Sequence, residues 1–322
     1  MADEAPSPRP SPPPGAREVG STLSPLGRGQ GEGSSGEGSS GEGSGGEGRR
    51  RTRPFRHVTF VAGLVITLAL VATAAVSLVY TPRDPLEMSI AGRLQGPSAA
   101  YPLGTDQFGR DLLSRVMQGA ITSILVGVIA VGIGMGAGVV FGILSGYFGG
   151  WLDEGFMRLV DAVQGFPAIL SALLLAAVFK PTLTISMVAI GVAFLPVFAR
   201  LTRASFLEFR DRDFVVAARA LGAGDGALIG RHILPNTLPP LIVQATISFP
   251  VAILAEAGLS YLGLGTQPPN PSWGLMLKEA QAFLSRNPWY AIFPGGAIAL
   301  TVLGLNLLGD GLRDLLDPKT AS

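Results

Sequence analysis

Long apolar runs constrain the fold of this chain more than any other feature of its sequence. The hydrocarbon core of a bilayer is about 30 Å thick, and a helix needs ~20 mainly apolar residues to cross it. Such a stretch has to be helical, because its backbone polar groups find no hydrogen-bond partners in lipid. Six stretches approach or meet this requirement, at residues 58–80, 121–147, 159–179, 183–198, 238–259 and 291–308. The sequence therefore predicts an all-α membrane protein with six transmembrane helices.

Charge and composition agree with a membrane protein and give it an orientation. Of the 322 residues, 48% are hydrophobic and only 15% are charged, a balance that favours a membrane protein over a soluble one. Basic residues concentrate before the first span and between the fourth and fifth spans. Loops rich in Lys and Arg stay on the cytoplasmic side of the membrane. Because an even number of spans returns the chain to its starting side, we expect both termini in the cytoplasm.

The composition divides the chain into three parts. Residues 1–52 are rich in Pro, Gly, Ser and Glu and have almost nothing apolar to bury. We expect them to be a disordered cytoplasmic tail, with a regulatory tether as the alternative role. Residues 53–120 contain the first span and an outer segment, in which Thr105 could cap an amphipathic helix at the membrane surface. Residues 121–318 hold the remaining spans and a polar loop at about 200–236.

Four glycines recur every fourth residue in the second span, so they share one face of the predicted helix. They are Gly134, Gly138, Gly142 and Gly146. Small residues at this spacing let the backbone of a neighbouring membrane helix approach closely. The sequence predicts a packing face here, and a glycine-lined path for a solute is the alternative.

The polar loop between the fourth and fifth spans is expected to fold into two short helices. Asp213 can cap the first helix, and Gly222 falls where a left-handed residue would end it, since glycine takes positive φ without strain. Asp225 can cap the second helix, and Pro235 is expected to end it. We call residues 211–236 the knob, and we expect it to project from the cytoplasmic face.

Three ionisable residues near the outer face are candidates for a gate or a receptor contact. Glu256 lies in an otherwise apolar span, about 20 residues or roughly 30 Å from the inner end of that span. Ionisable groups inside spans are functional candidates, and the alternative is a structural hydrogen bond to the outer loop. Asp106 and Arg110 precede the second span, where they either help to dock an external receptor or only anchor that span.

Several motifs resemble those of a known family of transport proteins. The knob has the spacing of the coupling loop, or EAA loop, of ABC-importer permeases, although Val216 stands at the usual glutamate position. The segments at 103–111, 256–265, 268–274 and 307–314 resemble the dipeptide/oligopeptide/nickel branch, and the similarity covers roughly residues 55–318. The knob residues that carry the resemblance are Ala217, Ala218, Gly222, Ile229, His232 and Pro235.

The resemblance implies a type I ABC importer permease fold, with residues 121–318 as its core and the knob as its coupling loop. It implies a pore-forming subunit that carries di- or oligopeptides across the cytoplasmic (inner) membrane. A second homologous permease, two cytoplasmic ATPase subunits and an extracytoplasmic solute-binding protein would be its partners. The ATPase subunits would dock on Ala217, Ala218, Leu221 and Ile229, with a fixed bend at Gly222. His232 would either contact the ATPase or pack inside the knob.

The residue inventory argues against catalysis by this chain. It has no Gly-x-x-x-x-Gly-Lys-Ser/Thr loop, so it cannot be a P-loop ATPase by itself, and ATP would be bound by partner subunits. With no cysteine and only His57 and His232, we expect no metal, no cofactor, no hydrolase site and no enzyme activity. We expect no nucleic-acid partner. Two alternatives stay open: a secondary transporter driven by an ion gradient, and an ABC importer of nickel chelates or glutathione-like solutes.

Overall fold

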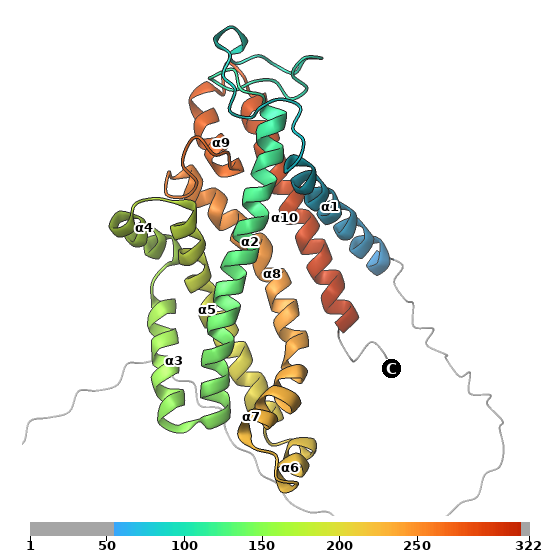
Figure 1. The fold of residues 1–322 in the computed structure, drawn as a ribbon, viewed down its shortest axis with the longest axis vertical. Helices are drawn as coiled ribbons and strands as arrows, with labels where there is room; N and C mark the ends of the chain where they lie inside the picture. Colours follow the sequence, from blue (N-terminus) through green and yellow to red (C-terminus); the bar gives the residue numbers. More distant parts are fainter. Residues whose placement is uncertain (1–54, 317–322) are drawn as a thin grey trace, which may run out of the picture. The chain divides into compact units, whose positions relative to one another are not determined.

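The computed structural model describes residues 55–316, so the tail predicted at residues 1–52 lies outside the described range. Apart from one isolated bridge between Thr105 and Asp111, the regular structure of this range is helical (Figure 1). The elements, in chain order, are α1 (Phe55–Ser77), the 3-10 turn η1 (Ile90–Gly92), α2 (Leu112–Ile143) with its π-helical continuation η2 (Leu144–Phe148), α3 (Gly150–Gly165), α4 (Ala168–Phe179), α5 (Leu183–Phe209), α6 (Asp213–Ala220), α7 (Asp225–Ala227), the π-helical η3 (Leu228–Ile233), α8 (Leu234–Tyr261), α9 (Trp273–Ala280), η4 (Gln281–Phe283) and α10 (Trp289–Leu316).

Within residues 55–316, 5 helical stretches are long and apolar enough to cross a membrane. They confirm five of the predicted spans in position, with boundaries that differ at their ends. These stretches are Val58–Ser77, Leu112–Phe148, Leu183–Phe209, Asp225–Tyr261 and Trp289–Asp314.

The predicted third span, residues 159–179, is divided between two helices. α3 ends at Gly165 and α4 begins at Ala168, so neither is long enough to cross the membrane alone. The break has a local cause: a residue that precedes proline is pushed out of the α region, and Phe166, before Pro167, has φ −95° and ψ 127°. In Figure 1, α3 rises from the lower end of α2, and α4 leads to the start of α5. Together, α3 and α4 carry the chain from the lower end of α2 to the start of α5 (Figure 1). That the chain crosses the membrane six times stays a prediction.

The start of α2 also differs from the prediction. Asp111 caps this helix by accepting a hydrogen bond from the Ser114 backbone N–H at 2.9 Å, so the helix begins at Leu112 rather than at residue 121. The predicted boundary between the parts at residues 53–120 and 121–318 therefore falls inside a continuous helix. The helix expected after Thr105 does not form, because the Thr105 hydroxyl instead donates to the carbonyl of Gly92 at 2.5 Å.

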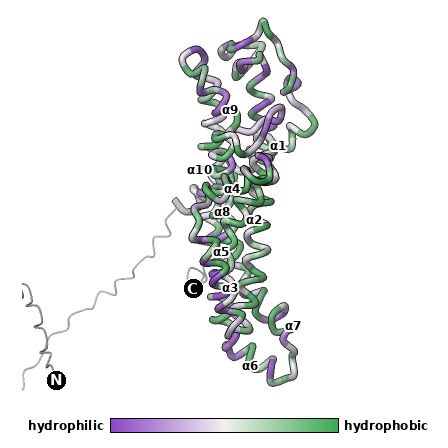
Figure 2. The backbone as a smooth tube through the Cα atoms, turned by 90° about the vertical axis from the view of Figure 1, so that its left-hand side faces the viewer, coloured by the Kyte–Doolittle hydropathy of each residue, from purple (hydrophilic) through white to green (hydrophobic). Residues whose placement is uncertain are grey.

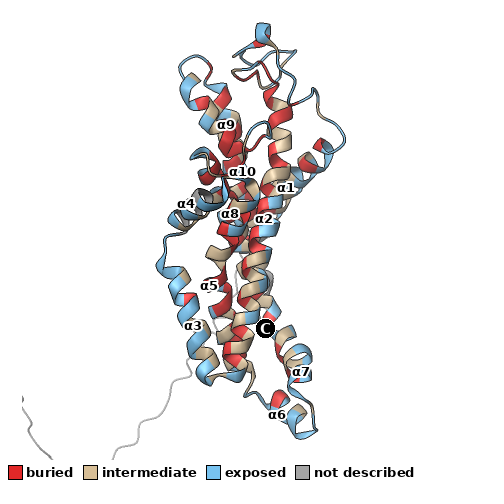
Figure 3. Ribbon diagram, turned by 60° about the vertical axis from the view of Figure 1, so that its left-hand side comes forward, coloured by how far each residue is buried: buried red, intermediate tan, exposed pale blue. Residues whose placement is uncertain are grey.

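The long helices form the core, and the polar segments lie at the two ends. Figure 2 shows hydrophobic colour along the long helices, with hydrophilic stretches mainly in the loops near α9 and around α6. Figure 3 shows buried positions along α5, α8 and α9, whereas α3 and α6 are largely exposed. A central cluster joins α2, α5 and α8 through Val126, Ile190, Phe198 and Leu241, each at most 5% exposed. This cluster connects the outer loops to the knob through three long helices.

Candidate functional site

The knob has its own small hydrophobic core, which attaches it to the ends of the long helices. Phe206 of α5, Val215 of α6, and Leu228 and Ile233 of η3 are each at most 1% exposed and pack together. Tyr147, at the end of η2, packs against this cluster. Burial on this scale fixes the knob as a rigid extension of α2 and α5.

Gly222 ends α6 with a hydrogen-bond pattern typical of helix C-termini. Its φ of +90° confirms the predicted left-handed conformation. The N–H of Gly222 donates to the carbonyl of Arg219 at 3.0 Å, and the N–H of Ala223 donates to that of Ala218 at 3.1 Å. This pair of bonds defines the Schellman motif and fixes the bend between α6 and α7.

Three local predictions about the knob were wrong. α6 and α7 have Arg212 and Gly224 at their N-caps, so Asp213 and Asp225 lie inside the first helical turns. The Asp225 carboxylate accepts a hydrogen bond from the Tyr147 hydroxyl at 2.5 Å instead. Pro235 does not end a helix but lies in the first turn of α8, where its missing N–H costs nothing.

The residues expected to dock on an ATPase divide into exposed and packed groups. Ala217 is exposed and Leu221 is 89% exposed, whereas Ala218 and Ile229 are partly buried in the core of the knob. His232 is also partly buried, and its backbone carbonyl accepts from the Asn236 side-chain amide at 2.6 Å.

Sequence reasoning did not count two exposed apolar residues of α6 among the docking residues. Phe214 is 43% exposed and Val216 is 52% exposed. The signal that could have found them is their position on either side of Val215 in the sequence, because a short helix that buries Val215 turns both neighbours away from the core by about 100°. We call Phe214, Val216, Ala217 and Leu221 the apolar tip. Exposed arginines flank it at Arg212, Arg219 and Arg231.

An ion pair ties α3 to α5 near the knob. Two guanidinium nitrogens of Arg203, Nε and Nη2, each donate to one carboxylate oxygen of Asp153 at 2.6 Å. The hydrogen bonds from Arg203 hold the pKa of the Asp153 carboxyl below its ordinary value, although partial burial acts in the opposite direction. About two helical turns further on, Arg210 donates to the carbonyl of Gly146 at 3.3 Å, which joins the ends of α5 and η2.

The four glycines of the second span lie on the face of α2 and η2 that packs against α5. A Cβ at Gly138 would lie 2.6 Å from the Cβ of Phe198, and one at Gly142 would lie 2.4 Å from that of Thr202. A Cβ at Gly134 or Gly146 would also come within 3.0 Å of α5. Real Cβ atoms essentially never come this close to their neighbours, so the two helices are in close contact from Gly134 to Gly146.

At the outer end, Asp106 and Arg110 belong to a buried network of charges. The Arg110 Nε lies 2.5 Å from an Asp106 carboxylate oxygen, and Arg110 and Arg115 both reach Glu279 of α9, at 3.3 and 3.2 Å. Asp106, Arg110 and Arg115 are at most 2% exposed, and Tyr290 of α10 donates to Glu279 at 2.8 Å. This arrangement anchors the start of α2 to α9 and α10, and it leaves neither Asp106 nor Arg110 at the surface for a receptor to contact.

Glu256 is buried at the outer end of α8, where it holds the following loop. The carboxylate accepts hydrogen bonds from Ser260 at 2.5 Å and from Thr266 at 3.2 Å. Ser260 in turn accepts from the backbone N–H of Thr266 at 2.9 Å. These contacts match the structural alternative for Glu256, a hydrogen bond to the outer loop.

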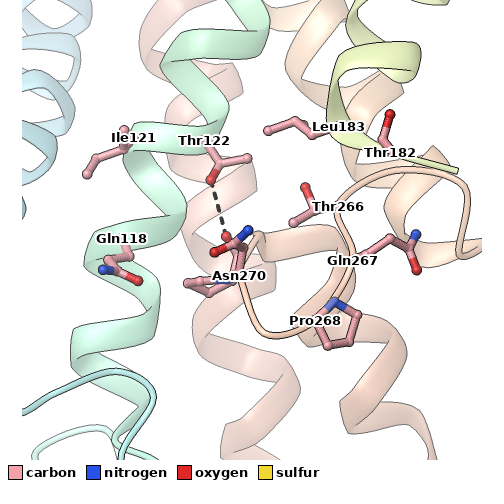
Figure 4. Close-up of a pocket in the computed structure, with 10 residues that line it drawn as sticks. Gln118, Ile121, Thr122, Thr182, Leu183, Thr266, Gln267, Pro268 and Asn270 are labelled. Carbon is pink, nitrogen blue, oxygen red and sulfur yellow. Dashed lines mark hydrogen bonds between the residues drawn. The ribbon is translucent and has the colours of Figure 1, made fainter.

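A polar pocket opens beside this loop, with a volume of about 420 Å³. As Figure 4 shows, α2 lines one side, the start of α5 a second, and the loop at residues 266–271 a third. Its polar lining consists of Gln118, Thr122, Thr182, Thr266, Gln267 and Asn270. Sequence reasoning missed this pocket, because its walls come from three distant segments.

Comparisons with known proteins agree with the fold. Over residues 138–322 the chain matches the family described as the binding-protein-dependent transport system inner membrane component. It is 43% identical to the dipeptide transport system permease protein DppC of Alkalihalophilus pseudofirmus, over 81% of this chain and 86% of that relative. It is 41% identical to the glutathione transport system permease protein GsiD of Pectobacterium atrosepticum, over 83% of this chain and 89% of that relative.

A solved structure shares the architecture at low sequence identity. The inward-facing MetNI methionine ABC transporter aligns with a TM-score of 0.52 and 19% identity, over 64% of this chain and 96% of that chain. The likeness shows a common fold, the type I ABC importer permease fold. Together with the family match and the apolar helices, it establishes this chain as a member of the binding-protein-dependent transport family, a multi-pass permease subunit of an ABC importer in the inner membrane.

Proposed function

We propose that this permease imports di- or oligopeptides, or a peptide-like solute such as glutathione, with force supplied by separate ATPase subunits. In this proposal a second homologous permease completes the pore, and an extracytoplasmic binding protein delivers the solute. Both termini and the knob lie in the cytoplasm, and two ATPase subunits hydrolyse the ATP. Family membership favours this ATP-driven mechanism over the ion-gradient alternative.

The proposal that the knob binds an ATPase subunit rests on the apolar tip. Leu221 is 89% exposed although it is a large apolar side chain, and Phe214 and Val216 of α6 are exposed as well. Exposed apolar residues gathered on a rigid projection are typical of a surface that binds another protein. The tip is joined to α5 and α8 through the buried core of Val215, Leu228 and Ile233. A displacement of the tip would therefore be transmitted directly to these membrane helices.

The solute class rests on the relatives. The similar proteins from Alkalihalophilus pseudofirmus and Pectobacterium atrosepticum are named for dipeptide and glutathione transport, and both solutes contain peptide bonds. A di- or tripeptide is therefore the solute that we would test first.

The transport proposal is tested with the whole complex in proteoliposomes. The chain is reconstituted with its partner permease, its ATPases and its binding protein, and uptake of radiolabelled alanyl-alanine and glutathione is measured. We expect uptake of at least one of them that requires internal ATP. Uptake driven by an ion gradient without the ATPases would overturn the mechanism, and ATP hydrolysis stimulated by the binding protein without uptake of either would overturn the solute class.

The role of the knob is tested with a matched pair of glycine variants. Gly222→Asp places a side chain at φ +90° and a charge beside Leu221, so we expect it to abolish uptake while membrane insertion stays normal. Gly224→Asp adds the same charge at a residue with φ −74°, where Asp is a good N-cap, and should transport normally. Uptake by Gly222→Asp equal to that of Gly224→Asp would contradict docking through the knob.

A further inference from the structure

The polar pocket at the outer end of α2 combines uncharged groups that can hydrogen-bond a peptide with an apolar lining of Ile121, Leu183, Pro268 and Pro271. Three of its lining side chains are carboxamides, Gln118, Gln267 and Asn270, and three are threonines. A carboxamide can donate to a carbonyl and accept from an N–H at the same time, which matches both halves of a peptide bond.

The walls of the pocket are held in place by bonds to three different helices. Thr122 of α2 donates to the carbonyl of Pro271 at 3.2 Å, and Ser186 of α5 donates to that of Leu264 at 3.0 Å. From α8, Glu256 and Ser260 bind Thr266. The loop is therefore fixed relative to α2, α5 and α8, and the pocket has a preformed shape.

Two of the carboxamides are not used by the fold. The amide of Gln267 donates to the carbonyls of Gly263 and Gly265, both at 3.0 Å. The side chains of Gln118 and Asn270, by contrast, make no hydrogen bond within residues 55–316. Figure 4 shows both of them at the rim between α2 and the loop, with Asn270 opposite Thr122. Unsatisfied carboxamides are costly against lipid, so this face meets water or a bound molecule.

We infer that this pocket is a subsite that hydrogen-bonds a peptide group of the solute as it enters the permease. The inference rests on the proposed function, because it assumes a peptide-like solute. A volume of about 420 Å³ lies in the range of small-molecule sites, which is about 300–1,000 Å³. The pocket has no charged lining side chain, so it would accept peptides whatever the charge of their side chains.

The test compares Gln118→Leu and Asn270→Leu with a matched control in the complete reconstituted transporter. Neither side chain holds the structure together, so both variants should insert and assemble normally. Gln281→Leu makes the same substitution at an exposed residue of η4 and serves as the control. Uptake of radiolabelled alanyl-alanine should fall about fivefold in each pocket variant, the effect of losing one ordinary hydrogen bond, and should be unchanged in the control.

ATP hydrolysis separates the possible outcomes. If the solute binds the pocket, hydrolysis stimulated by the binding protein stays at the wild-type level while uptake falls. If solute-free binding protein loses its stimulation in the pocket variants, the pocket receives the binding protein, and the solute subsite is wrong. Uptake equal to that of Gln281→Leu would also overturn the subsite while leaving the proposed function intact. If wild-type protein imports neither alanyl-alanine nor glutathione although the binding protein stimulates hydrolysis, the proposed solute class fails and the subsite fails with it.

Discussion

The hydroxyl of Tyr147, at the end of the long second membrane helix, donates a 2.5 Å hydrogen bond to the carboxylate of Asp225 in the knob. The two residues are 78 positions apart in the chain. This bond is a direct polar link between a transmembrane helix and the surface that we propose an ATPase moves.

Removing the hydrogen bond between Tyr147 and Asp225 should weaken the transmission of movement from the knob to the membrane helices. Tyr147→Phe keeps the ring in the core of the knob but loses the bond, which is solvent-exposed and is worth about 0.5–1 kcal/mol. We expect uptake per ATP hydrolysed to fall about two- to fivefold. Tyr101→Phe is the control, because the hydroxyl of Tyr101, on the outer side, makes no hydrogen bond within the described residues. Equal uptake by the two variants would show that the link does not matter.

The apolar tip should tolerate no charge at its centre. Leu221→Asp changes an 89% exposed residue, so folding is preserved, but it places a carboxylate in the proposed contact with the ATPase. Loss of an apolar contact and burial of a charge should lower ATP-dependent uptake about tenfold or more. Leu284→Asp adds the same charge at a 49% exposed residue on the outer side and should have little effect. Normal copurification of the ATPases with Leu221→Asp would argue against the tip as their binding surface.

The packing of α2 on α5 should be sensitive to a single methyl group. Gly138→Ala puts a Cβ within 2.9 Å of the Ala199 backbone nitrogen, and an overpacked core loses about 1–3 kcal/mol. We expect a lower Tm of the purified protein in detergent. Gly136→Ala is the control, since a Cβ there meets nothing within 4 Å, and its Tm should be unchanged or raised, because alanine favours the helix. A Tm for Gly138→Ala at or above that of Gly136→Ala would contradict close packing.

The ion pair between Asp153 and Arg203 predicts a pH dependence with a definite sign. Because Arg203 lowers the pKa of Asp153 in the folded state, the pair stabilises the fold fully above the ordinary value of 3.8, and this stability is lost as the pH falls through the lowered folded-state pKa. The Tm of wild type should exceed that of Asp153→Asn at neutral pH, and the difference should begin to shrink as the pH falls below 3.8 and vanish below the lowered folded-state pKa. A difference that is independent of pH would show that the carboxylate charge contributes nothing.

The parts of the fold that were predicted correctly depend on local patterns. Apolar length located five membrane helices, and glycine periodicity located the face of α2 that packs on α5. The left-handed turn at Gly222 followed from glycine chemistry alone. The sequence pattern that marks each of these features lies within a single segment, so the sequence of that segment is enough to predict it.

The parts that were missed depend on partners far away in the chain. The first turns of α2 contain Ser114, Arg115 and Gln118 and so did not look like a span, yet Arg115 is buried there in an ion pair with Glu279 of α9. Tyr147 pairs with Asp225 across the knob, and the polar pocket joins three segments. The helix break at Pro167 was also missed, although its cause is local. The long apolar run around Pro167 looked like one continuous span.

The glycine contacts between α2 and α5 have a mechanical consequence. Two backbones in contact over so many turns cannot slide or bend independently, so the pair should rotate as one lever. α5 has 27 residues and is therefore about 40 Å long, with the knob at one end and the polar pocket at the other. A tilt of this lever about its midpoint would move the pocket and the knob in opposite directions by equal amounts. Each displacement of the knob would therefore open or close the outer end of the permease.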